Sequence, residues 1–390
     1  MQYSDNAMCT ILLCSYIGIK KDSLIKPLSL GEWNQLLDNF IEMKCEPGIV
    51  LKQDLNILKE MKYSDNYIKR IQDLVSRGGI VAFELDDLER RGIHVVTLFD
   101  SDYPVLIKRR LKRKTPPILY YAGDIELSKK IGIAVVGSRN VDKEGIEFTK
   151  KLVRKASKER LVIYSGGAKG VDTISEETAI QCGSAVVSFV ADSLISRIKR
   201  KDTIEYMMKG KLLLVSDVKP DVGFSAARAM NRNKLIYASS YGAFVVESDY
   251  NKGGTWAGAV ETIKNNWTNV FIWENKKFIG NEKLIDKGGI PYSLESEDIY
   301  DLITQKDIKY GQLNLFDINR AVVQEEKVEY TNDLYKIVNQ FIIQRLENGL
   351  DVNEASKVFN IAKGQMNIWL KRLVSDGLAE KINGKYIKKD

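Results

Sequence analysis

Short apolar runs recur along the middle of the chain, separated by polar or amphipathic stretches of helical length. Runs without polar alternation are typical of strands buried on both faces, and their alternation with helices indicates a mainly parallel sheet covered on both sides. We therefore expect an α/β domain over residues 96–302. The runs that predict strands are residues 131–136, 161–164, 185–190, 212–215, 243–247 and 269–273.

The residues before 95 follow a helical period instead. Ser29 and Glu32 have the spacing of a capping box, and an apolar stripe follows them. Another helix is expected over residues 65–77, where the glycine pair at 78–79 would end it. These patterns predict a helical N-terminal domain, residues 1–95.

Residues 303–330 are polar and aperiodic and are interpreted as a linker. Beyond them, helices are expected at 331–346, 352–359 and 363–375, followed by two short strands around Asn383-Gly384. Asn-Gly between short strands is a strong hairpin signal, and three helices with a hairpin form a winged-helix pattern. We expect a winged-helix domain at 331–390, which binds either duplex DNA or a protein. The polar side chains of its third helix and wing are Lys363, Gln365, Asn367, Lys371, Arg372, Lys385, Lys388 and Lys389.

The composition narrows the chemistry. Among 390 residues the net charge is +7, which permits a polyanionic partner. The densest basic run, residues 108–114, suits either a solvated turn or a polyanion contact. The single histidine, His94, lies in an apolar run and is expected in the core or on an edge strand. Because the one histidine is expected in the core or on an edge strand, we expect neither a histidine-based triad nor a two-histidine metal site, and the four cysteines lack zinc spacing. We expect no metal, no cofactor and no catalytic residue.

No apolar run approaches the roughly 18–20 residues of a membrane span, and the first residues lack the basic start of a signal peptide. The expectation is a cytoplasmic protein without a membrane partner.

Two glycine-bearing loops follow successive predicted strands. Gly137, Ser138 and Arg139 come directly after the first, where a tight turn and a following helix would direct amides and a guanidinium at an anion. Residues 165–170, Ser-Gly-Gly-Ala-Lys-Gly, could present further backbone amides to a phosphate. Neither loop is a dinucleotide fingerprint or a Walker A loop. Each alone could be a structural turn; together they predict one concave anion site at the sheet edge.

Two later motifs suit the same edge. Arg228 and Arg232 are four residues apart and are expected on one helix face, with Phe224 before them as a platform for a base. The glycines after Lys252 suit a close backbone approach, and Thr255 could cap the next helix. The residues expected to bind nucleic acid or phosphate are Gly137, Ser138, Arg139, Ser165, Gly166, Gly167, Lys169, Gly170, Phe224, Arg228, Asn231, Arg232, Lys252, Gly253, Gly254 and Thr255.

In their order, the blocks VGSR, SGGAKGVD, MNRN and GNEKLIDKGG resemble those of the DprA/Smf family of DNA-processing proteins over about residues 95–292. The flanking regions resemble that family only in architecture. The resemblance implies a Rossmann-like core that binds single-stranded DNA without catalysis, forms a homodimer and helps to load a RecA-type recombinase.

Several positions depart from the family pattern. Lys169 stands where the family usually has arginine, which weakens bidentate geometry, and the histidine expected after Asp172 is replaced. An alternative is therefore a divergent member serving an anti-phage defence or toxin–antitoxin system, with a cognate toxin as partner.

An enzymatic alternative comes from the related phosphoribohydrolase fold. Gly253, Gly254 and Thr255 with Glu261 partly match the loop of enzymes that cleave a base from a nucleotide, although the proline is missing. A nucleotide sensor or nucleotide N-glycosidase is the corresponding hypothesis. No clustered carboxylates suit a two-metal nuclease.

A short peptide in the linker resembles those that bacterial proteins insert into the sliding clamp. Exposed apolar residues in a polar linker need a partner, which is either the clamp or the protein's own core. The residues concerned are Gln312, Leu313, Leu315 and Phe316.

Overall fold

The computed structural model describes residues 3–20, 22–52, 55–295, 297–304, 342–343, 346, 349–359, 363–382 and 384–389. Contacts divide the chain into two compact units, Met1–Val323 and Gln324–Asp390. The division into four parts at 95, 302 and 330 stays a prediction. The first two residues of the predicted linker, 303 and 304, are the end of a helix, whereas the rest of the linker and the clamp-type peptide lie outside the described residues.

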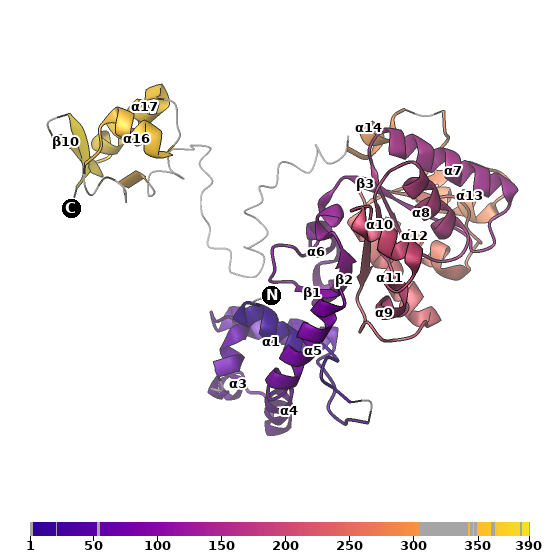
Figure 1. Cartoon of the computed structure of the whole chain (residues 1–390), viewed down its shortest axis with the longest axis horizontal. Helices are drawn as coiled ribbons and strands as arrows, with labels where there is room; N and C mark the ends of the chain where they lie inside the picture. Colours follow the sequence, from indigo (N-terminus) through magenta and orange to yellow (C-terminus); the bar gives the residue numbers. More distant parts are fainter. Residues whose placement is uncertain are drawn as a thin grey trace. The chain divides into compact units, whose positions relative to one another are not determined.

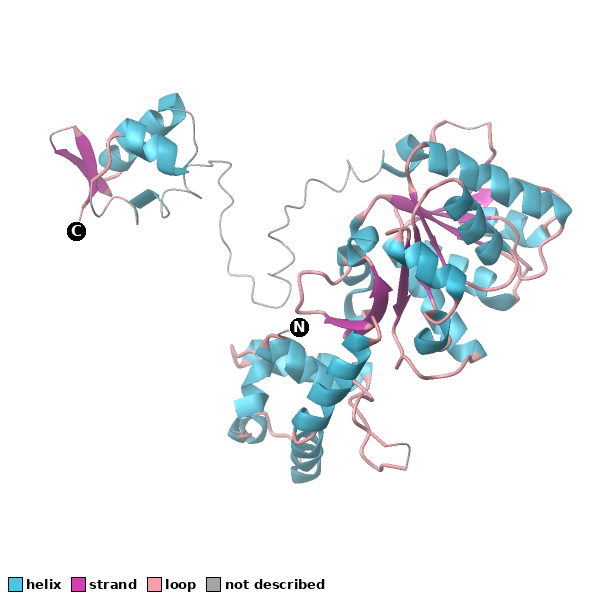
Figure 2. Cartoon of the chain, viewed as in Figure 1, coloured by secondary structure: helices cyan, strands magenta, loops and turns pink. Residues whose placement is uncertain are grey.

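The first unit is built on a nine-stranded sheet (Figures 1 and 2). Its strand order is β1-β2-β6-β5-β4-β3-β7-β8-β9, and all pairs from β6 to β9 are parallel, while β2 pairs antiparallel with both β1 and β6. The α/β, mainly parallel, Rossmann-like core is thereby confirmed. The strands are β1 (His94–Thr97), β2 (Ile118–Gly123), β3 (Gly132–Val136), β4 (Val162–Ser165), β5 (Val186–Phe189), β6 (Leu212–Ser216), β7 (Gly242–Val245), β8 (Asn269–Trp273) and β9 (Ile290–Tyr292).

Helices cover both faces of this sheet. Side chains of β3 alternate between two apolar clusters: Ile133 and Val135 face one, and Ala134 and Val136 face the other. Helices α7 (Lys143–Lys158) and α8 (Val171–Gln181) pack in the first cluster, and α11 (Ala226–Ser239) and α12 (Gly253–Asn265) pack in the second. The remaining helices are α9 (Leu194–Arg197), α10 (Lys201–Met208), α13 (Ile279–Asp286) and α14 (Ile299–Thr304). His94 opens β1, the edge strand, as expected.

The N-terminal helices form a smaller core of their own around Trp33, Leu36 and Phe40. The capping box is confirmed, because the Ser29 amide donates to Glu32 Oε2 at 2.7 Å and the Glu32 amide donates to Ser29 Oγ at 3.3 Å. The elements are α1 (Asp5–Cys14), α2 (Leu30–Glu42), the 3-10 helix η1 (Pro47–Lys52), α3 (Asn56–Glu60), α4 (Asp65–Val75) and α5 (Gly78–Arg90).

The glycine pair at 78–79 does not separate a helix from a loop. Helix α4 ends at Val75, and Gly78 already begins α5. The cause is Arg77, which is buried, 7% exposed, at the junction. Its guanidinium donates to the carbonyls of Leu74, Ile17 and Leu12, and so holds the turn that the glycines were expected to make.

The basic run 108–114 covers the end of α6 (Val105–Leu111) and the 3-10 helix η2 (Lys112–Lys114). Most of its charged side chains contact other residues of the chain. Arg113 pairs with Asp38 of α2 at 2.8 Å, and Lys114 pairs with Glu261 of α12 at 2.8 Å. Arg110 donates to two carbonyls at the end of α11. The run is therefore a clasp between the N-terminal helices and the sheet domain, which favours a structural role over a polyanion contact.

The second unit contains α16 (Val352–Phe359), α17 (Lys363–Ser375) and the antiparallel hairpin β10 (Ala379–Ile382) and β11 (Lys385–Lys388). Both helices and the hairpin are where the sequence predicts them. Ile382 pairs with Lys385, and Gly384 has a φ of +85° in the connecting turn. The helix expected at 331–346 lies mostly outside the described residues, so the complete winged-helix domain stays a prediction.

In the part of the chain that the structure describes, no helix is both long and apolar enough to cross a membrane.

Arg77→Met should destabilise the first unit by about 2–4 kcal/mol, because it leaves buried carbonyls without a donor. Urea unfolding measures the change. Arg90→Ala is the matched control: Arg90 pairs with Asp86 at the surface of α5, and its loss should change the free energy of unfolding by at most about 0.5 kcal/mol. Equal effects of the two substitutions would contradict the role given to Arg77.

Candidate nucleic-acid interface

A cavity of about 350 Å³ lies at the carboxyl ends of the neighbouring strands β3 and β7. Residues 137–140 after β3 and 247–249 after β7 form part of its wall, and α11 and the start of α12 close it. Ligands of open α/β sheets bind at this edge. The predicted residues that line it are Gly137, Ser138, Arg139, Arg232, Lys252, Gly253, Gly254 and Thr255.

The loops at this edge are in direct contact. The Val171 amide donates to the Ser138 carbonyl at 3.3 Å, and a Cβ at Gly170 would overlap that carbonyl and lie 2.7 Å from the Arg139 carbonyl. Gly170 also has a φ of +80°. The loop after β4 therefore supports the loop after β3, and only glycine permits this backbone approach.

The first turn of α12 faces the cavity without a side-chain cap. Its N-cap is Lys252, which makes no capping hydrogen bond, and a Cβ at Gly253 would meet nothing within 4 Å. Thr255 was expected to cap this helix; instead its hydroxyl donates to the Gly137 carbonyl at 3.0 Å. An uncapped helix N-terminus carries partial positive charge and attracts anions. Lys252 adds a full charge at the same place.

Arg139 and Phe224 form the exposed rim. The Arg139 Cζ lies 5.6 Å from the Phe224 ring centroid, and Phe224 is 58% exposed. A guanidinium over an aromatic ring forms a cation–π contact. Ser225, which follows Phe224, caps α11 by accepting from the Arg228 amide at 3.1 Å. The rim thus places an exposed guanidinium beside an exposed aromatic ring.

The second glycine loop does not offer the amides that the sequence suggested. The Gly167 amide donates to Glu176 Oε1 at 2.8 Å, and the Ala168 amide lies 3.4 Å from Asp172 Oδ2. Two carboxylates of α8 thus lie against the amides that were expected to bind a phosphate. Lys169 remains exposed, but it is not among the residues lining the cavity.

Arg232 is buried beneath the cavity rather than displayed beside Arg228. It is 4% exposed, its Nη1 donates to the Phe189 carbonyl at 2.6 Å, and a Cβ at Gly166 would overlap its guanidinium. Although the two arginines are four residues apart on α11, they do not present one exposed surface, because Arg232 is buried at this cavity and Arg228 lines another. Burial lowers the pKa of Arg232, and the nearby carboxylate of Asp172 opposes this change.

The other predicted residues have separate positions. Ser165 is fully buried and its hydroxyl donates to the Val135 carbonyl at 3.2 Å, and Asn231 donates to Asp217 at 3.2 Å. Arg228 lines a different cavity. The sequence prediction omitted two residues that hold these loops. The Asn233 side chain donates to the Gly254 carbonyl at 3.0 Å, and Glu176 accepts from the Gly167 amide. The i, i+4 spacing of Asp172 and Glu176 directly after the glycine loop was the available signal for the latter.

Carboxylates also face the cavity. Burial raises the pKa of Asp172, and it raises that of Glu247, whose Oε2 accepts from the Asp142 amide at 3.4 Å. Among the described residues, no group of three or more His, Cys, Asp or Glu side chains could hold a metal ion.

The enzymatic alternative lacks its carboxylate at this site. Glu261 is paired with Lys114 and does not line the cavity beside Gly253, Gly254 and Thr255.

The profile of the family described as DNA recombination-mediator protein A matches residues 94–304, more than half of the chain. The chain belongs to this family. The match covers the sheet and every lining residue of the cavity. It confirms the resemblance to DprA/Smf proteins that the sequence blocks indicated.

Curated relatives agree. The chain is 30% identical to the DNA processing protein DprA of Streptococcus pneumoniae over 139 residues, which are 35% of this chain and 49% of that protein. It is 26% identical to DprA of Bacillus subtilis over 229 residues, 57% of this chain and 75% of that protein. The chain thus spans about half of the length of the pneumococcal relative.

The crystal structure of the Streptococcus pneumoniae protein has a similar fold. The TM-score is 0.52 at 20% identity, and the likeness covers 75% of this chain and 95% of that one.

Gly170→Ala should destabilise the protein more than Gly183→Ala does. Both glycines have positive φ, near +80°, but a Cβ at Gly183 would meet nothing within 4 Å. Gly183→Ala measures the cost of a Cβ at positive φ in open space, about 1–2 kcal/mol. The excess measured for Gly170→Ala in chemical unfolding reports the clash with Ser138 together with the strain of the Gly170 backbone, whose ψ is −130°. Equal losses would show that the two loops do not depend on this contact.

Burial raises the pKa of Glu176 to about 7 from an ordinary 4.5, and its hydrogen bonds with Ser188 and Gly167 only partly oppose this. Between these values the unfolded chain releases the proton that the folded chain keeps, so folding stability is lost as the pH rises from about 4.5 to 7. The unchanged protein should lose about 1–3 kcal/mol of folding stability between pH 5 and pH 7.5, and Glu176→Gln should abolish this loss. Thermal or urea unfolding at both pH values measures it.

Glu177→Gln is the matched control, because Glu177 is exposed on the same helix. It should retain the pH dependence of the unchanged protein. A Glu176→Gln protein with that same dependence would exclude Glu176 as its source.

Proposed function

We propose that the chain binds single-stranded DNA, without catalysis, through the cavity at the ends of β3 and β7. One observation carries the proposal: Arg139, Lys252 and the uncapped start of α12 border one concave site. A guanidinium, an ammonium group and helix amides are together suited to a phosphate.

The rim favours a single strand over a duplex. Phe224 presents more than half of its surface to solvent beside Arg139. Base stacking on an aromatic side chain requires bases that are already unstacked from a partner strand, and it tolerates any sequence. Binding should therefore be insensitive to sequence and strongly dependent on salt.

The family description supports a role in recombination. We extend the proposal to presentation of the bound strand to a RecA-type recombinase by a homodimer of this chain. The departures at Lys169 and after Asp172 leave a defence or toxin–antitoxin setting as the alternative use of the same DNA site.

Arg139→Ala should weaken binding to a labelled oligothymidylate by about tenfold or more. Because one phosphate contact is lost, it should also reduce the slope of log Kd against log salt concentration by about 1. Fluorescence anisotropy over a salt series measures both. Arg139 is exposed, so the fold should tolerate the change.

The matched control is Arg154→Ala, which removes the same charge from an exposed position on α7 far along the helix from the cavity. It should leave both the affinity and the salt slope nearly unchanged. If the two variants bind alike, the protein's general positive charge and not this cavity accounts for binding.

A further inference from the structure

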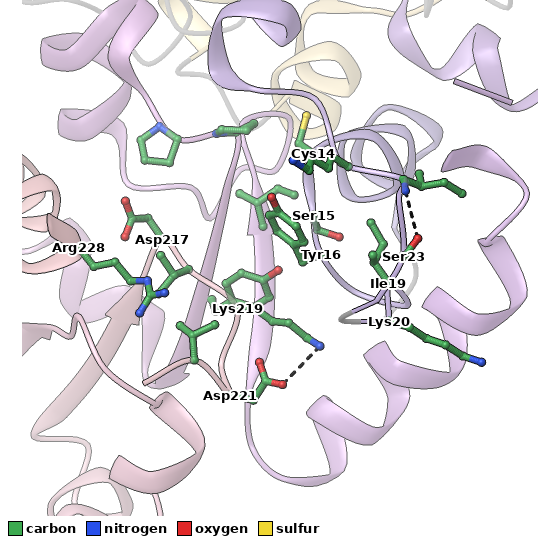
Figure 3. A pocket seen from close by; sticks show the side chains of 18 residues that line it. Cys14, Ser15, Tyr16, Ile19, Lys20, Ser23, Asp217, Lys219, Asp221 and Arg228 are labelled. Carbon is green, nitrogen blue, oxygen red and sulfur yellow. Dashed lines mark hydrogen bonds and ion pairs between the residues drawn. The ribbon is translucent and has the colours of Figure 1, made fainter. Parts of the chain in front are cut away.

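A second cavity, of about 570 Å³, lies where the N-terminal helices meet the sheet (Figure 3). We call it the junction cavity. Described residues between Cys14, the last residue of α1, and Lys26 form one wall. Pro116, Pro117 and the first residues of β2 form another, and residues between Asp217 and Arg228, after β6, complete it. The DNA site described above uses none of the N-terminal residues of this cavity.

The lining combines an aromatic face with four cationic side chains, of which Lys219 pairs with Asp221 and Arg228 donates to the Gly223 carbonyl. Tyr16 is 54% exposed, and Pro117 and Ile118 are further apolar lining residues. Within the part of the chain that the structure describes, the side chains of Tyr16 and Lys20 have no recorded hydrogen bond or ion pair. The cationic lining residues are Lys20, Lys26, Lys219 and Arg228.

The two carboxylates of the cavity are already engaged. Asp221 lies 3.4 Å from the Lys219 ammonium group, and Asp217 accepts from the Asn231 side chain at 3.2 Å. Four cations against two carboxylates leave the lining with a net positive charge. This balance suits an anion with an apolar face, which is the chemistry of a nucleotide.

One chain segment contributes residues to the walls of both the junction cavity and the DNA site. Arg228 lines the junction cavity, whereas Ala226, Ala229 and Met230 line the cavity at the end of β3. Phe224, beneath Arg139, precedes all four on the same segment. A strand that passes from Arg139 across Phe224 is therefore led toward Arg228.

We propose that the junction cavity binds a further nucleotide of the same single strand, with its base against Tyr16. In Figure 3, Arg228 lies on one side of Tyr16 and Lys20 on the other. A nucleotide within a strand has a phosphate on each side of its base, which matches this placement. The N-terminal helices are thus part of the DNA path. This inference rests on the proposed function.

The test compares oligothymidylates of about 6 and about 20 nucleotides, since sites of this kind span roughly 4–16 nucleotides. The full chain with Tyr16→Ala and Lys20→Ala should bind the longer strand about tenfold more weakly, and the shorter strand as the unchanged protein does. Tyr16→Phe should retain full affinity, because the ring and not the hydroxyl stacks.

The matched control is Phe83→Ala with Lys59→Ala, which removes an exposed aromatic ring and one lysine from the same helical region outside the cavity. It should bind both lengths normally. As a second measurement, the longer strand should protect Lys20 and Lys26 from acetylation, whereas the shorter one should not.

Other outcomes overturn the inference. Normal binding of the longer strand by the Tyr16/Lys20 variant removes the cavity from the DNA path. Binding of thymidine monophosphate that depends on Tyr16, without any effect on the longer strand, assigns the cavity to a free nucleotide. Protection of Lys20 by a partner protein but not by DNA assigns it to protein docking. Failure of the proposed function has a different signature: Arg139→Ala leaves binding of both lengths unchanged.

Discussion

The close packing of the loop after β3 on the loop after β4 is the constraint on which the candidate site depends. Gly170 lies against the Ser138 carbonyl, in a backbone conformation that other residues rarely adopt. Because the second loop is fixed by Glu176, Asp172 and Arg197, which donates to the Gly167 carbonyl at 3.2 Å, the first loop rests on a rigid support. Arg139 is therefore held at the rim by backbone contacts rather than by its own side chain.

Charge at the site is divided between a buried layer and an exposed one. Arg232, Asp172 and Glu176 form the layer beneath the loops. Burial shifts the pKa of each in the direction that favours its neutral form, downward for Arg232 and upward for the two carboxyl groups. Arg139 and Lys252 lie on the solvent side of the cavity, where both side chains are exposed. The lower groups connect the loops to one another, so the shape of the cavity is set by the protein itself.

The N-terminal helices are fastened to the sheet domain at several points. Ile11, Leu12 and Val81 enter the same apolar cluster as β3, and Arg113 and Asn34 connect α2 to the clasp at 108–114. This attachment gives the junction cavity two stable walls. The basic run takes part in this attachment, because Arg113 and Lys114 pair with carboxylates and Lys108 and Arg110 donate to backbone carbonyls of the chain itself.

The sequence alone predicted six of the nine strands of the main sheet, the capping box at Ser29, the positions of α16 and α17, and the family, because these depend on local periodicity, on turn residues and on short blocks such as Val135–Arg139. The strands β1, β2 and β9 were not among those predicted. The sequence also located Arg139 and the glycines of α12 at one sheet edge, since parallel strands end together. Only the tertiary structure decided which side chains reach that edge. Arg228 and Arg232 share a helix face by spacing, yet Gly166 leaves room for the guanidinium of Arg232 alone, and Glu176 takes the amide that a phosphate was expected to use. The spacing of two residues along a helix determines the direction in which their side chains point. Whether a side chain is buried depends on the space that the neighbouring elements leave for it.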